Sequence, residues 1–202
     1  MSDGGGAGER NRLLLSDASF AVGSVCFAFA ALPSVAVALG AIVTNVVFVV
    51  GSVFFTLGAG LALGVPNRSS SIVQFVGTLF FNVSTSLALA AAVPAGAAGG
   101  TGWRPDAYGS ICFLVSSLIA VVAVARQRGS TRDRAGAALN LLGSVLFGFA
   151  AVGAFVLPGT SALLSPFWTG VGTVGGAVCF LAAALIGLLP TRSVQRAATA
   201  SK

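Results

Sequence analysis

The chain has 202 residues, of which 56% are hydrophobic and only 8% are charged, and it contains no histidine. A soluble domain carries roughly 25% charged residues, because charged side chains solvate its surface. Eleven basic and five acidic residues are too few for a soluble globule of this size. The composition therefore excludes an ordinary cytoplasmic protein and predicts a polytopic membrane protein.

Six long apolar segments follow one another along the chain. The predicted spans are residues 18–38, 42–64, 71–93, 107–125, 135–157 and 166–189. A helix needs about 20 apolar residues to cross a bilayer, and no Asp, Glu, Lys or Arg lies inside these spans. We expect an all-α fold with a six-helix transmembrane domain over residues 18–189, a tail of residues 1–17 before it and a tail of residues 190–202 after it.

The boundary between the first two helices is the least defined, since residues 18–64 hold no charge. The turn could lie at Leu32-Pro33-Ser34 or at Leu39-Gly40-Ala41. We favour the later position, which leaves Pro33 as a kink near the end of the first helix.

The basic residues predict the orientation in the membrane. Ten of the eleven Lys and Arg residues fall on one side when the spans are threaded, and only Arg104 falls on the other. Loops rich in Lys and Arg stay in the cytoplasm, so we expect both termini to be cytoplasmic. The preference for Arg over Lys, with abundant Ala, Gly and Val, suggests a GC-rich bacterial genome and hence the inner membrane of a bacterium.

One connection concentrates basic residues and could dock anionic lipid headgroups or a membrane-protein partner. It contains Arg126, Arg128, Arg132 and Arg134. Because the basic residues of the chain are otherwise spread over several short segments, a nucleic-acid partner is not expected.

One five-residue pattern recurs in every predicted helix: a glycine, a small residue, two apolar residues and a phenylalanine. Its Gly and Phe residues are Gly23 and Phe27, Gly51 and Phe55, Gly77 and Phe81, Gly109 and Phe113, Gly143 and Phe147, and Gly176 and Phe180. Residues i and i+4 share one helix face, and glycine lets a neighbouring helix approach closely. We interpret the pattern as a Gly-Ser-x-x-Phe helix-packing motif that arose by duplication, and favour this over a glycine-lined pore or pocket.

The duplicated unit is left open by the sequence. Asp17 and Asp106 open the first and fourth predicted helices, and Asn45 and Asn140 lie in the second and fifth. This correspondence is consistent with two halves of three helices each, which would be inverted relative to one another, as in many transporters. Three successive hairpins in one orientation are the equally supported alternative.

Polar residues inside the predicted spans offer few routes to chemistry. Asn45, Gln74 and Asn140 either hydrogen-bond between helices or line a cavity for a small polar solute, and the first role is the commoner. We expect Asp17 and Asp106 to cap helix N-termini. No carboxylate inside a span is predicted, and no catalytic residue, metal site or cofactor site is expected.

Four segments of the apolar region carry a resemblance to a known family: Phe48–Phe55, Gly176–Leu181 before Leu188–Pro190, Gly102–Pro105 and Asn140–Ser144. In a six-helix arrangement, these segments resemble the YrhK-like bacterial membrane proteins. That family implies no activity and no functional residue that can be transferred.

Two functions are therefore expected. The first is a non-enzymatic structural or accessory role in the inner membrane, with lipids or another membrane protein bound through the basic loop. The alternative is a transporter or channel for a small neutral solute, with Asn45, Gln74 and Asn140 facing a central cavity.

Overall fold

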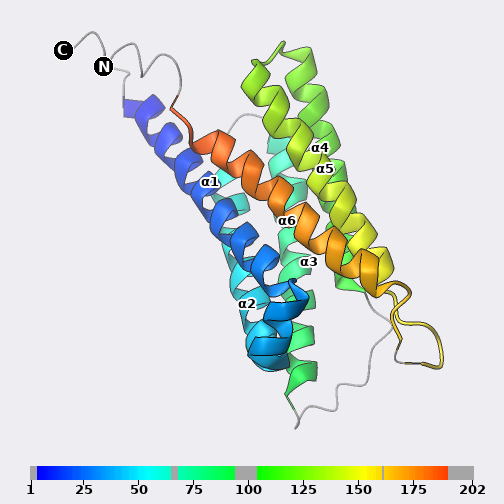
Figure 1. The fold of residues 1–202 in the computed structure, drawn as a ribbon. Coiled ribbons are helices and arrows are strands. Elements are labelled where there is room, and N and C mark those ends of the chain that lie inside the picture. Colours follow the sequence, from blue (N-terminus) through cyan, green and yellow to red (C-terminus); the bar gives the residue numbers. More distant parts are fainter. Residues whose placement is uncertain (1–3, 65–67, 94–103, 161, 191–202) are drawn as a thin grey trace.

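The computed structural model describes residues 4–64, 68–93, 104–160 and 162–190, and this part of the chain is helical apart from turns and one isolated β-bridge between Val156 and Leu163. The helices are α1 (Gly4–Ala30), α2 (Pro33–Ala62), α3 (Arg68–Ala92), α4 (Pro105–Arg126), α5 (Thr131–Gly153) and α6 (Pro166–Leu188) (Figure 1). All six are long and apolar enough to cross a membrane, which confirms the predicted all-α, six-helix fold. Residues 1–3 and 191–202 of the two predicted tails lie outside the described residues.

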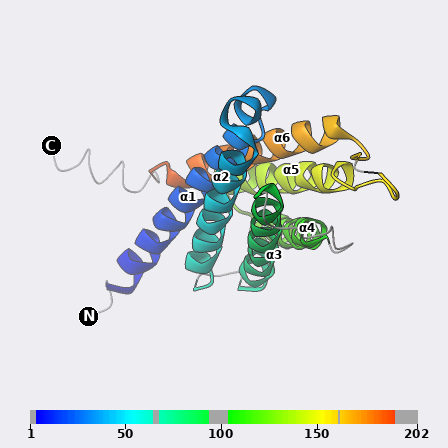
Figure 2. The same ribbon diagram turned by 90° about the horizontal axis from the view of Figure 1, so that it is seen from below.

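The six helices form a closed ring. Each helix packs against the next one in the chain, and α6 also packs against α1. One end of the ring holds the start of α1, the end of α6 and the α4–α5 connection with its arginines (Figure 1). We call this the basic end. The α1–α2 turn and the α5–α6 connection lie at the opposite end, from which Figure 2 views the molecule.

The distribution of side chains is inverted relative to a protein that folds in water. Large aliphatic residues cover the outer surface, including Val37, Val152 and Ile111 with exposed fractions of 84%, 62% and 59%. Small hydroxyl residues such as Ser52 and Thr78 are completely buried instead. Lipid tails solvate aliphatic side chains as well as a protein core does, whereas polar groups must find partners inside the bundle. This is the surface of an integral membrane protein.

Hydroxyl groups hold neighbouring helices together. Ser70 Oγ of α3 donates to the Ser116 carbonyl of α4 at 2.9 Å, and Ser116 Oγ donates to the Ser70 carbonyl at 3.0 Å. The Ser52 and Thr85 hydroxyls, 3.0 Å apart, join α2 to α3. These bonds satisfy side chains that the bilayer could not.

The turn between α1 and α2 differs from the favoured prediction. It lies at residues 31–32, and Pro33 opens α2, where a proline's fixed φ suits the first turn and its missing N–H costs nothing. The prediction of Pro33 as a kink near the end of the first helix is therefore wrong. The chain also leaves helical geometry at the favoured position, where Gly40 has a φ of +74° and separates two helical stretches of α2. Glycine adopts this conformation without steric cost.

The position of Asp17 also corrects the sequence prediction. Helix α1 begins at Gly4, within the predicted tail, so Asp17 lies in the middle of the helix and caps nothing. It also falls inside the candidate span Gly6–Ala30, which places a carboxylate where none was predicted. Charged residues end an apolar run without ending a helix, and Arg12 ties this early part of α1 to α2 by donating to the Leu61 carbonyl at 3.2 Å.

Within each hairpin, the motif glycine of one helix packs against the motif phenylalanine of the other. A Cβ atom on Gly23 would lie 2.8 Å from the Phe55 ring, and one on Gly51 would lie 2.7 Å from the Phe27 ring. The same reciprocal contacts join α3 to α4 and α5 to α6: Gly77 with Phe113, Gly109 with Phe81, Gly143 with Phe180, and Gly176 with Phe147. The helices can approach this closely because the glycine has no side chain.

Candidate functional site

The six motif phenylalanines meet at the centre of the ring. Their exposed fractions are between 2% and 7%, and they form one cluster. Within the hairpins, ring centroids lie 5.1 Å apart for Phe27 and Phe55, and 5.0 Å apart for Phe81 and Phe113. Such spacing is ordinary aromatic contact. The cluster therefore fills the axis of the bundle with six rings, one from each helix.

The cluster has two layers, which come from helices of opposite direction. Phe27, Phe81 and Phe147, from the odd-numbered helices, form a triangle with centroid distances of 5.6 to 6.3 Å. In the other layer, Phe180 lies 6.3 Å from Phe55 and 5.9 Å from Phe113. Each layer borders a different cavity.

The cavity at the basic end has a volume of about 190 Å³, and its apolar floor is the layer of Phe55, Phe113 and Phe180. Its polar lining is supplied by Ser16, Asp17, Gln74 and Asn140, from α1, α3 and α5. The Ser16 hydroxyl is already committed, because it donates to the Gly58 carbonyl at 2.8 Å. The carboxylate and the two side-chain amides are the groups left to bind a solute.

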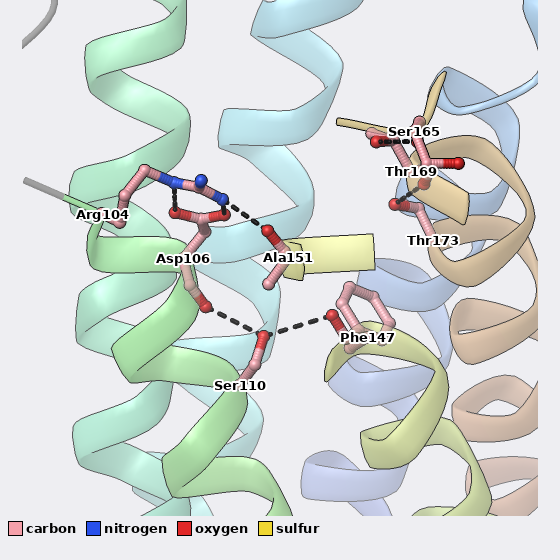
Figure 3. A network of polar contacts seen from close by, with 8 residues as sticks. All are labelled: Arg104, Asp106, Ser110, Phe147, Ala151, Ser165, Thr169 and Thr173. Atoms are coloured by element: carbon pink, nitrogen blue, oxygen red, sulfur yellow. Dashed lines mark hydrogen bonds and ion pairs between the residues drawn. The ribbon is translucent and has the colours of Figure 1, made fainter. Parts of the chain in front are cut away.

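The cavity at the opposite end has a volume of about 130 Å³ and borders the other phenylalanine layer. Its polar lining includes Asp106 and Ser110 of α4 and Thr169 and Thr173 of α6. Figure 3 shows how hydrogen bonds hold these groups: Ser110 lies between the carbonyls of Asp106 and Phe147, at 2.9 and 3.4 Å. The Thr169 hydroxyl donates to the carbonyl of Ser165, the residue before α6, and the Thr173 hydroxyl donates to the Thr169 carbonyl.

Asp106 forms an ion pair, not the predicted helix cap. Its carboxylate oxygens accept hydrogen bonds from Arg104 Nε at 2.8 Å and Nη2 at 2.5 Å, and Nη2 also donates to the Ala151 carbonyl of α5 at 2.6 Å (Figure 3). The side-chain hydrogen bond with Asp106 raises the pKa of Arg104 above its ordinary value, so the guanidinium keeps its charge. The charge of the carboxylate at this end is therefore neutralised within the protein.

The Arg104→Gln variant should lose about 1–3 kcal/mol of unfolding free energy, because it leaves the Asp106 carboxylate without its partner. Denaturant titration of the purified protein in detergent micelles would measure the loss. Arg10→Gln is the control, since Arg10 is exposed. The double variant Arg104→Gln/Asp106→Asn should be more stable than Arg104→Gln alone, and equal stability of the two would contradict the ion pair's role.

A single register places polar side chains on the axis. Gln74, Asp106, Asn140 and Thr173 each precede the motif glycine of their helix by three residues, and hence precede its phenylalanine by seven. Residues seven apart lie on the same face of a helix, so a side chain at this position faces the axis as the phenylalanine does. This spacing is visible in the sequence and could have been used to identify Thr173, which the sequence analysis did not single out.

Other residues singled out from the sequence lie elsewhere. Asn45 does not line the basic-end cavity: its side chain donates to the Ala41 carbonyl of its own helix at 2.9 Å. In the basic loop, Arg126, Arg128 and Arg134 are exposed. Arg132 is half-buried and donates from Nη2 to the Gly187 carbonyl of α6 at 2.7 Å.

The geometry is that of a multi-pass membrane protein with two cavities on the axis of a helical ring, separated by the phenylalanine cluster. In the described part of the chain, no group of three or more His, Cys, Asp and Glu residues is placed to bind a metal ion. The three cysteines are free and half-buried. No family model, curated protein or solved structure matches the chain, so the resemblance to the YrhK-like proteins stays a prediction.

Proposed function

We propose that the protein conducts a small polar solute across the membrane along the axis of the six-helix ring. The observation that carries this proposal is the pair of cavities stacked on either side of the phenylalanine cluster, each with polar side chains in its lining. A purely structural role, the first expectation from the sequence, needs no polar cavity on the axis. The proposed role is that of a channel or transporter without catalytic activity.

The phenylalanine cluster acts in this proposal as the gate. Constrictions lined by apolar side chains close a pathway because water leaves them. Two layers of closely packed rings separate the cavities, so a solute crosses only when some of these rings move aside.

The size of the cavities supports a small solute. Their volumes of about 190 and 130 Å³ exceed the roughly 10–15 Å³ that one water molecule requires. The reciprocal Gly–Phe contacts within α1–α2, α3–α4 and α5–α6 support three hairpins as the repeated unit.

In the proposed topology, the basic end of the ring faces the cytoplasm, because loops rich in arginine favour that side of the membrane.

Solute flux into proteoliposomes tests the proposal. The full-length protein is reconstituted, and shrinkage and re-swelling after an osmotic step are followed by light scattering with urea, acetamide, glycerol or sucrose outside. Labelled methylammonium is measured separately by filtration. We expect flux of at least one of the small solutes above that of protein-free liposomes, and no added flux of sucrose. Flux equal to that of empty liposomes for every solute would refute the proposal.

A further inference from the structure

The two cavities differ in their charge. At the opposite end, Asp106 is paired with Arg104, whereas Asp17 is the one carboxylate among the residues lining the basic-end cavity. We propose that the basic-end cavity binds a small ammonium-type cation through Asp17 and the phenylalanine rings around it. This inference rests on the proposed function where it names the transported solute, but the binding itself can be measured separately.

The Asp17 carboxylate is without an ion-pair partner within the described part of the chain, although the Arg132 charge acts on it from a greater distance. It packs against Gly187 of α6, whose missing side chain leaves the space that the carboxylate occupies. The ion pair of the described residues is Arg104 with Asp106, and no hydrogen bond to Asp17 occurs among them. An ionisable group withdrawn into a membrane protein is costly without a partner and marks a pathway or a binding site. A bound cation would supply that partner.

Arg132 lies close by without forming the ion pair. Its guanidinium donates to the carbonyl of Gly187, the residue against which the Asp17 carboxylate packs. Because this guanidinium is held on the end of α6, it stays beside the cavity and repels a cation there. Removal of its charge should strengthen cation binding, while removal of the Asp17 charge should weaken it.

The remaining walls suit an organic cation or ammonium better than a metal ion. Phe20 lines the cavity together with Phe55, Phe113 and Phe180, and a cation over the face of an aromatic ring is attracted by its quadrupole. The amide oxygens of Gln74 and Asn140 can accept hydrogen bonds from N–H donors. Aromatic rings cannot replace the water ligands of a strongly hydrated metal ion, so an N–H cation is the ligand class that this lining recognises.

Calorimetric titration of the full-length protein in nanodiscs with methylammonium chloride tests the site. Urea serves as the neutral comparison and sodium chloride controls for ionic strength. We expect saturable binding of methylammonium, an affinity about tenfold or more lower in Asp17→Asn, and an affinity several-fold higher in Arg132→Gln. The matched control is Glu9→Gln, which removes an exposed carboxylate from the same helix and should bind like the wild type.

The opposite signs expected for Asp17→Asn and Arg132→Gln separate recognition from damage to the fold, because a destabilised protein would bind less in both variants. Wild-type affinity in Asp17→Asn, or wild-type protein that binds urea but not methylammonium, would overturn the inference. Methylammonium binding without flux of any solute would refute the proposed conduction and leave the binding site in place. Flux of a neutral solute without methylammonium binding would refute the proposed cation site and support the proposed conduction.

Discussion

Replacing Phe27 with alanine should open the axis of the bundle and increase solute flux by roughly tenfold in proteoliposomes. Phe27 is only 3% exposed and contacts rings of both phenylalanine layers, at centroid distances of 5.1 Å to Phe55 and 5.9 Å to Phe147. Its truncation removes a ring from the barrier between the cavities. The same change should lower the free energy of unfolding by about 3–5 kcal/mol, as is usual for a buried phenylalanine.

The matched control lies two residues further along the same helix. Phe29 is 47% exposed on the lipid-facing surface, so Phe29→Ala should leave both flux and stability close to the wild type. Phe27→Leu removes the ring but keeps a large apolar side chain in the cluster. It therefore tests the same position if the alanine variant does not fold. If folded Phe27→Ala and Phe29→Ala conduct every solute equally, the phenylalanine cluster is not the barrier.

The spans and the motif could be predicted because they depend on local sequence. The length of an apolar run determines whether a helix can cross a bilayer, and a spacing of four places Gly and Phe on one helix face. Asp17 shows the limit of this reasoning. An apolar run ends at a charged residue, but the helix that contains the run continues for as long as its residues favour helix and tertiary contacts such as Arg12 with Leu61 hold it.

The cavities could be predicted only in part. Gln74, Asp106 and Asn140 share their register with the motif phenylalanines, but the sequence alone does not say which face of an apolar helix meets lipid, a neighbour or the axis. Asn45 is equally polar and lies six residues before its glycine, where its amide bonds to its own helix. Closure of the ring by α1 and α6 determines these faces. That contact joins segments far apart in the chain, so no local pattern indicates it.

The second large effect is expected at a motif glycine. Gly143→Leu should force α5 and α6 apart at this contact, since a Cβ atom there would lie 2.9 Å from the Phe180 ring and 3.0 Å from the Gly176 carbonyl oxygen. The remaining leucine atoms would be closer still. Overpacking a well-filled site costs about 1–3 kcal/mol, and occasionally more. Thermal unfolding in detergent, together with the yield of monodisperse protein, would measure the loss.

Gly148 provides the control, because it belongs to the same helix and has no atom within 4 Å of the position that a Cβ would take. Gly148→Leu should be neutral or slightly stabilising, since leucine favours a helix over glycine by up to about 1 kcal/mol. The Phe180 ring is one of two obstacles at Gly143, so Phe180→Ala should recover part of the stability lost in Gly143→Leu. This coupling between neighbours is what the reciprocal contact requires. Purely additive effects of the two substitutions would mean that Gly143 and Phe180 act independently. The motif would then not be a helix-packing motif.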